Sequence, residues 1–242
     1  MSFKNIFLSL FSKENIFYTI VIFIALVVLV TNRALNGFTS LLWLADFASL
    51  FGVIYVVLIA KHNFLGLVFN LLSSILLVFI NIYQKIYFTG LVCLCISIPS
   101  IIFAIINWKR EDKQGKDNLN VLTSKGKIIS WLLYLVVAII FGTILYFLNG
   151  NLFYLDALYS AGITVGLILC ARAYIDQFAI FIVADIFAII MYSILCVQNL
   201  NNISLLFMVF IFEIVSIKAH FNWKSLLKNK KIKNQQKQEK IN

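Results

Sequence analysis

The stretch AIFIVADIFAIIMYS, residues 179–193, is almost entirely apolar except for one carboxylate, Asp185, near its middle. A run of this kind fits inside a bilayer-spanning helix, which needs about 20 predominantly apolar residues. Similar blocks recur along the whole chain, whose 242 residues are 62% hydrophobic and only 12% charged. Long apolar blocks without alternation are typical of polytopic membrane proteins. The sequence therefore predicts an all-α membrane protein.

Eight membrane spans are predicted from these blocks. They cover residues 16–31, 41–60, 64–83, 86–108, 128–148, 152–171, 178–197 and 203–222. The first block also resembles the apolar part of a signal peptide, but no convincing small-residue cleavage site follows it, so we interpret it as an extra helix. An even number of spans places both termini on the same side of the membrane.

The basic residues predict which side that is. If the termini and alternate loops lie in the cytoplasm, 18 of the 20 lysines and arginines lie there, and only Arg33 and Lys85 lie outside. This distribution follows the positive-inside rule. The net charge of +10 therefore reflects topology, and we expect membrane lipid rather than nucleic acid as the surrounding partner.

Cysteine and histidine indicate no metal or disulfide chemistry. The four cysteines, Cys93, Cys95, Cys170 and Cys196, all fall inside apolar spans, where a free thiol behaves as a small hydrophobic group. A disulfide framework or a zinc site needs clustered ligands in a wetter setting. We expect no metal site and no cofactor.

The chain resembles itself on either side of the hydrophilic loop 109–127. The stretch LADFASLFGVIYVVLIAK, which ends at Lys61, matches YLDALYSAGITVGLILCAR, which ends at Arg172. Further along, IINWK ends at Lys109 and HFNWK ends at Lys224. Polar landmarks that recur at a nearly constant offset indicate an internal duplication.

We interpret the duplication as two parallel three-helix repeats joined by a linking helix, a 3+1+3 layout. Three is an odd number, so the extra span at 128–148 is needed to return the chain to its original side. Parallel repeats are typical of transporters whose substrate site lies near the bilayer midplane. The predicted units are an N-terminal segment with an extra helix (1–40), the first repeat (41–108), a loop and linking helix (109–148), the second repeat (149–224) and a basic tail (225–242).

Four acidic residues lie inside predicted spans: Asp46, Asp156, Asp185 and Glu213. An ionised acid at the centre of a membrane helix costs about 2.5–3.5 kcal/mol, so such residues usually face protein or water. Asp46 and Asp156 lie near helix ends, where a structural and a functional role are equally plausible. Asp185 and Glu213 lie deeper, which favours a functional role.

Helical spacing predicts which side chains share a face with these acids. Two stripes stand out, Phe178, Phe181, Asp185 and Tyr192 on one helix and Asn70, Ser74 and Asn81 on another. Polar and aromatic stripes that converge suggest a cavity for a small molecule. Hydrogen bonding between helices is the competing explanation, and we favour it for Ser160 and Thr164.

The basic residues also restrict the substrate. Every lysine and arginine lies at or beyond a predicted membrane edge, which disfavours a phosphorylated ligand. Carboxylates beside aromatic rings instead suit a cation. No pair of nucleophile and base is visible, so we do not expect an enzyme. A receptor or scaffold without transport stays open as an alternative.

The run ARAYIDQFAIFIVADIFAIIMY, residues 171–192, resembles the second-half signature of the PnuC-type nicotinamide riboside transporters. That signature has Ala-Arg, an acid, an Asn, two Trp and an Asp, and the matching positions are Arg172, Asp176, Gln177, Phe178, Phe181 and Asp185. The first half is similar through Gly52, the Ala60-Lys61 ending, Tyr87, Pro99 and Trp108. The likeness covers about residues 41–224.

This resemblance implies a layout related to the SWEET sugar transporters, a homotrimer in the bacterial inner membrane, and uptake of nicotinamide riboside by facilitated diffusion. Together with the stripes, it predicts these substrate-binding residues: Asp185, Phe178, Phe181, Asn70, Ser74, Tyr192, Trp43 and Glu213. Both signature Trp positions hold Phe here. Another vitamin precursor (thiamine, riboflavin or a nucleoside) and proton coupling are therefore kept as alternatives.

Overall fold

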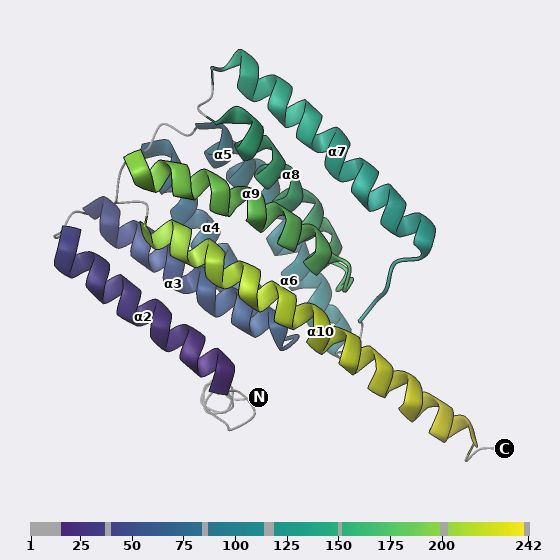
Figure 1. Cartoon of the computed structure of the whole chain (residues 1–242). Coiled ribbons are helices and arrows are strands. Elements are labelled where there is room, and N and C mark those ends of the chain that lie inside the picture. Colours follow the sequence, from purple (N-terminus) through teal and green to yellow (C-terminus); the bar gives the residue numbers. More distant parts are fainter. Residues whose placement is uncertain are drawn as a thin grey trace.

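A computed structural model describes residues 16–36, 40–83, 87–113, 119–149, 152–198 and 203–239. These residues form a bundle of helices (Figure 1). In chain order the helices are α2 (Ile16–Asn36), α3 (Ser40–Ala60), α4 (Leu65–Tyr83), α5 (Tyr87–Val92), the π-helical turn η2 (Cys93–Ser97), α6 (Ile98–Lys113), α7 (Ser124–Phe147), α8 (Phe153–Cys170), α9 (Gln177–Gln198) and α10 (Ile203–Glu239).

The described helices fit the membrane prediction. Seven spans, with α5, η2 and α6 counted as one, are long and apolar enough to cross a bilayer, and α2 contributes a shorter apolar stretch, Ile16–Thr31. Many large apolar side chains on the outside of the bundle are exposed, as expected when lipid rather than water surrounds the helices. The all-α prediction is confirmed, with seven spans and an additional N-terminal helix.

The fourth predicted span, 86–108, is confirmed as a span, Thr89–Arg110, but it is not one continuous α-helix. It is divided into α5, the turn η2 and α6. Pro99 lies in the first turn of α6, where its missing N–H is tolerated. The Ile98 N–H donates to the carbonyl of Cys93, one residue further back than in an α-helix. A π-turn of this kind widens the helix locally and often lies at a functional site.

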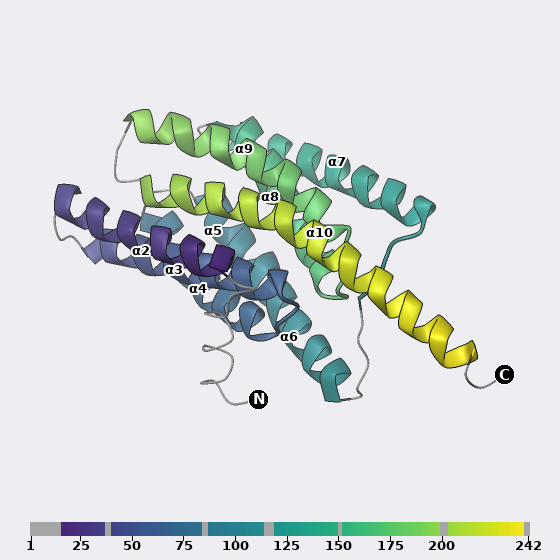
Figure 2. The same ribbon diagram turned by 60° about the horizontal axis from the view of Figure 1, so that its bottom comes forward.

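Six of the spans enclose the centre of the bundle. Helix α3 packs against α4 and α10, α10 packs against α9, and α9 packs against α8. The α5–η2–α6 span completes the enclosure because it packs against both α4 and α8. Helix α7 lies outside against α8, and α2 lies at the opposite edge against α3 and α10 (Figures 1 and 2).

Helices α3 and α8 end in the same way. A residue just beyond each helix has a left-handed backbone: His62, two residues after α3, with φ 56°, and Ala173, three residues after α8, with φ 49°. The N–H of Asn63 donates to the carbonyl of Leu58 (3.0 Å), and the N–H of Tyr174 donates to that of Leu169 (3.1 Å). Both arrangements satisfy carbonyls that a helix C-terminus otherwise leaves without partners.

Helix α2 is attached to the bundle at both ends. Near its C-terminal end, Arg33 forms a buried ion pair with Asp46 and lies over the Trp43 ring. Near its N-terminal end, the Asn222 amide donates to the Tyr18 hydroxyl (2.7 Å), and the Lys61 Nζ lies 4.9 Å from the centroid of the same ring. Burial lowers the pKa of Lys61 to about 8.

Helix α10 extends far beyond the bundle, to Glu239 (Figure 1). The predicted basic tail, 225–242, therefore continues this helix over most of its length. Helix α2 begins at the same end of the bundle at which α10 leaves it (Figure 1).

Candidate substrate cavity

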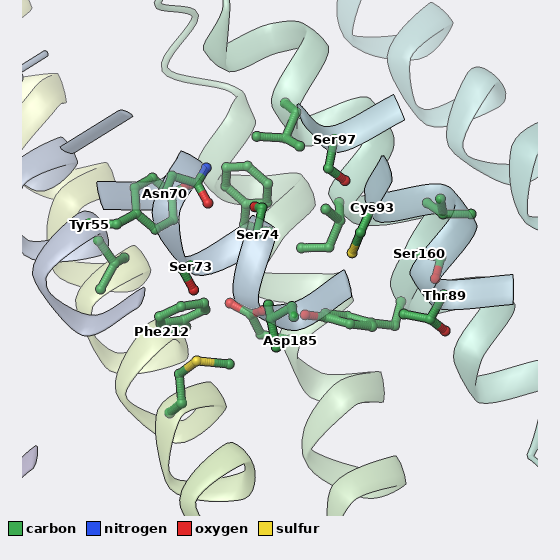
Figure 3. Close-up of a pocket in the computed structure, with 18 of the residues that line it drawn as sticks. Tyr55, Asn70, Ser73, Ser74, Thr89, Cys93, Ser97, Ser160, Asp185 and Phe212 are labelled. Carbon is green, nitrogen blue, oxygen red and sulfur yellow. The ribbon is translucent and has the colours of Figure 1, made fainter. Parts of the chain in front are cut away.

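A cavity lies at the centre of the bundle, between the helices that precede the 109–127 loop and those that follow it. Its walls come from α3, α4, α5 with η2, α8, α9 and α10. Figure 3 shows the side chains of Asn70, Ser74, Thr89, Ser97 and Asp185 from several of these elements around one space. Every one of the six enclosing spans thus contributes to a single cavity.

Asp185 is the charged residue in this wall. Its side chain is 2% exposed, and its Oδ1 atom has no hydrogen-bond partner among the described residues. Among the residues that the structure describes, no lysine, arginine or histidine lines the cavity. A buried carboxylate without a countercharge is strongly unfavourable, so this position favours a bound cation or a proton.

Six of the eight predicted substrate-binding residues line the cavity. They are Asp185, Phe178, Phe181, Asn70, Ser74 and Tyr192. Phe178 and Phe181 are almost fully buried, at 1% and 7% exposed. The ring of Phe181 lies directly over Gly166, because a Cβ at Gly166 would collide with it. The stripes read from helical spacing therefore meet in space.

The structure does not bring Trp43 and Glu213 to the cavity wall. Trp43 is 44% exposed and stacks on Phe47 at the edge of the bundle. Glu213 follows Phe212, which does line the cavity, but its own side chain points elsewhere. Its carboxylate nevertheless interacts electrostatically with that of Asp185.

Asp156 and Asp46 have structural partners. The Thr89 hydroxyl donates to the Asp156 carboxylate (2.9 Å), and Ser160 donates to the same group (3.0 Å). Asp46 accepts from the Ser204 hydroxyl at 3.0 Å in addition to its ion pair with Arg33. These contacts favour the structural interpretation of both acids.

Two tryptophans connect the two halves of the bundle at the end opposite Asp46 and Asp156. The Trp108 Nε1 donates to the carbonyl of Cys170 (3.0 Å), and the Trp223 Nε1 donates to that of Ile59 (3.2 Å). Trp108 belongs to α6 and bonds the end of α8, whereas Trp223 belongs to α10 and bonds the end of α3. Each half of the bundle is therefore hydrogen-bonded to the other half.

Aromatic rings close the cavity at this end. Phe178, which lines the cavity, contacts Trp223 edge-on with ring centroids 5.0 Å apart. His62 lies between the two tryptophans, 4.7 Å from Trp108 and 5.0 Å from Trp223. Packed aromatic rings of this kind exclude water and form an apolar layer at this end of the cavity.

The volume of the cavity is about 90 Å³. Pockets that enclose a small-molecule ligand usually measure about 300–1,000 Å³. The helices must therefore separate or side chains must rotate before a ligand the size of a nucleoside fits. The structure corresponds to a contracted form of the site.

Several lining residues were missed by the sequence analysis. They are Tyr55, Ser73, Thr89, Cys93, Ser97, Tyr159, Met208, Phe212 and Ser216. Thr89 could have been found, because Thr89 and Ser204 are 115 positions apart, the same offset that relates the two Asn-Trp-Lys endings. Ser160, interpreted as a helix-to-helix contact, both bonds Asp156 and lines the cavity.

Membrane-length helices around an enclosed, mostly apolar cavity with a few polar groups define the architecture of a small-molecule transporter. The family model for the nicotinamide mononucleotide transporters matches residues 42–225. This match covers most of the chain, which therefore belongs to that family. It is a multi-pass membrane transport protein, as the sequence resemblance predicted.

Two individual proteins illustrate the similarity. The nicotinamide riboside transporter PnuC of Neisseria mucosa is 25% identical over 194 residues, which cover 77% of this chain and 73% of the relative. A crystal structure of the vitamin B3 transporter PnuC matches with a TM-score of 0.69 at 21% identity, covering 88% of this chain and 92% of that one. The second comparison supports the fold.

Proposed function

We propose that this protein takes up nicotinamide riboside across the bacterial inner membrane by facilitated diffusion. The substrate is bound near the middle of the bilayer, between the two halves of the bundle. The observation that carries the proposal is Asp185, a buried carboxylate in a cavity wall to which no described residue contributes a basic side chain. The pyridinium ring of the substrate supplies the positive charge that this position lacks.

The charge of the cavity favours the riboside over the mononucleotide. A phosphate group in a low-dielectric site normally recruits arginine or lysine, and the described part of this cavity wall contains neither. Close to Asp185 the phosphate would also meet a like charge, which is strongly unfavourable away from bulk water. The related PnuC of Neisseria mucosa carries a name that specifies the riboside.

Different lining residues contact different parts of the substrate. Phe178 and Phe181 flank the planar ring and offer their faces to its positive charge. Asp185 faces the ring charge or the ribose, and Asn70 and Ser74 hydrogen-bond to ribose hydroxyls. Tyr192 completes the wall. Trp43 and Glu213 lie outside the contracted cavity and reach the substrate only once the helices have moved.

The finer architecture is the 3+1+3 layout, with α3 to α6 as one repeat, α7 as the linking helix and α8 to α10 as the other. The crossed hydrogen bonds support it: Thr89 with Asp156 corresponds to Ser204 with Asp46, and the Trp108 and Trp223 bonds correspond in the same way. The distribution of basic residues supports cytoplasmic termini. We further propose a homotrimer, which native mass spectrometry tests.

A binding panel tests the substrate. Purified protein in detergent is titrated with nicotinamide riboside, nicotinamide mononucleotide, thiamine, riboflavin and uncharged nucleosides. We expect nicotinamide riboside to bind tightest and the mononucleotide at least about tenfold more weakly, the factor that corresponds to one charged contact. Preference for the mononucleotide would overturn the charge argument, and preference for thiamine or riboflavin would reassign the ligand.

Flux into liposomes tests the mode of transport. Facilitated diffusion predicts that nicotinamide riboside equilibrates across the membrane and that an uncoupler leaves the initial rate unchanged. With the membrane potential held at zero, accumulation driven by an imposed proton gradient and abolished by an uncoupler would instead assign a proton to Asp185 or Glu213. No flux in protein that binds the ligand would indicate a receptor.

A further inference from the structure

A second cavity lies at the end of the bundle where α10 leaves it. Its volume is about 280 Å³, larger than that of the central cavity. It is formed by residues 121 and 122, the first turns of α7 and α9, and the middle of α10. Under the orientation proposed above, this end lies at the cytoplasmic face.

The wall segment that precedes α7 is fixed in place. The N–H of Asn120 donates to the carbonyl of Ala173 (3.0 Å), and the N–H of Ile175 donates back to Asn120 (3.0 Å). The Asn120 side chain also donates to the carbonyl of Arg172 (2.8 Å). The cavity is therefore bounded by backbone that is hydrogen-bonded to the α8–α9 connection.

Asp176 is the one carboxylate that the described residues place in this cavity, and it already has partners. Oδ2 of Asp176 accepts from the N–H of Leu122 (2.8 Å), and Oδ1 lies 3.3 Å from the Nζ of Lys127. The second lysine in the wall, Lys224, has no carboxylate partner among the described residues. The cavity therefore has one cation in excess.

Two further groups favour an anion here. His220 lines the cavity; its Nδ1 atom is buried and has no hydrogen-bond partner among the described residues, and both ring nitrogens donate when the imidazole is protonated. The N-terminal turn of α9 contributes Ala179 to the wall, so the positive end of that helix dipole lies at the cavity.

We propose that this second cavity binds a phosphate group, held between Lys224, Lys127 and His220. Two lysines and an imidazole around one space form a phosphate site, because each can donate to a different phosphate oxygen. The central cavity has a lone carboxylate instead, so a phosphorylated compound that the transport site rejects is accepted here. The site lies outside the transport pathway, and its occupancy is independent of Asp185.

The phosphate can belong to a soluble monoester or to a lipid headgroup. Trp131 favours the soluble source, because its ring lines the same cavity. An exposed indole face stacks on the planar ring of a nucleotide. A lipid headgroup would contact the lysines but would not stack on the indole ring of Trp131.

The test uses full-length protein in phosphatidylcholine nanodiscs, titrated calorimetrically with adenosine 5′-monophosphate and with inorganic phosphate. Lys224→Met should weaken adenosine monophosphate binding by roughly tenfold or more, the loss expected for one charged contact. The control Lys228→Met, one turn further along the exposed face of α10 and outside the cavity wall, should bind like the wild type. Trp131→Leu should weaken the nucleotide and leave inorganic phosphate unchanged.

Nanodiscs that contain phosphatidylglycerol distinguish the sources. If they abolish nucleotide binding in the wild type, the lipid headgroup is the occupant; unchanged binding assigns the soluble monoester. The Asp185→Asn variant should keep wild-type affinity for adenosine monophosphate even where it loses nicotinamide riboside. Absence of phosphate binding in both lipids, or equal affinities for Lys224→Met and Lys228→Met, would overturn the proposal. If Lys224→Met fails to fold, the effect of His220→Gln on adenosine monophosphate binding provides a second test of the site.

Discussion

The two cavities of this protein have opposite charge. The central one is enclosed by six spans and has a buried carboxylate, with no basic side chain from the described residues in its wall. The second lies at the end of the bundle and has two lysines and a histidine around a carboxylate that is already bonded. The difference follows from depth, because a buried acid can be kept neutral or paired with a cationic ligand, whereas lysines are stable only where water reaches them.

The largest effect is expected from Asp185→Asn. The substitution keeps the size of the side chain and removes its negative charge, so uptake of nicotinamide riboside should fall at least about tenfold. Radiolabelled uptake into cells, normalised to the amount of protein in the membrane, measures it. Lys224→Met is the matched variant in the other cavity and should leave uptake intact. Normal transport by Asp185→Asn would remove the distinction between the cavities.

A smaller effect is expected from Gly166→Ala. The new methyl group would occupy the position of the Phe181 ring, which must rotate into the central cavity or lose its packing. We expect weaker ligand binding with modest loss of stability, because overpacking typically costs about 1–3 kcal/mol. The control is Gly142→Ala, where the added Cβ meets only Ala157 at 3.6 Å. Equal ligand affinities for the two variants would show that the ring position does not shape the site.

The crossed hydrogen bonds should differ in strength. Thr89→Val leaves Asp156 with Ser160 as its one remaining side-chain partner, whereas Ser204→Ala leaves Asp46 in its ion pair with Arg33. We therefore expect Thr89→Val to lower stability by about 1–2 kcal/mol and Ser204→Ala by less. Thermal unfolding in detergent measures both. The opposite order would mean that the Arg33 pair does not support Asp46.

The smallest effect concerns Lys61, a buried cation at the same end of the bundle as the second cavity. Burial lowers its pKa from 10.5 to about 8. Below pH 8 the folded protein bears the full cost of the buried charge. Between pH 8 and 10.5 the unfolded state binds the proton and the folded state does not, so stability should rise with pH in this window.

Melting temperatures at pH 7 and pH 9.5 measure the Lys61 effect. Lys61→Met should reduce the rise of the melting temperature between pH 7 and pH 9.5. Lys109→Met, at the exposed end of α6, should leave this rise unchanged. An equal rise in wild type and Lys61→Met would show that another group is responsible. Such a result would also weaken the contrast between buried and exposed lysines at this end of the molecule.

Composition and helical spacing were enough to predict the class of fold and six of the residues that line the central cavity. Apolar blocks of bilayer length specify helices because the backbone must satisfy its own hydrogen bonds in lipid. A fixed rotation of 100° per residue places Asp185, Phe178, Phe181 and Tyr192 on one face whatever the neighbouring helices are. The same spacing relates Asn70 to Ser74. These features are local, so they can be read along the chain.

Contacts between helices could be decided only by the tertiary structure. Tyr55, Tyr159 and Phe212 reach the cavity because of how α3, α8 and α10 rotate about their own axes, which depends on packing against neighbours. Trp43 lies away from the cavity because Arg33 and Phe47 hold its ring at the edge of the bundle. The second cavity combines side chains from α7, α9 and α10 that are up to about 100 positions apart. No spacing rule connects such residues, because their proximity results from the folding of the whole chain.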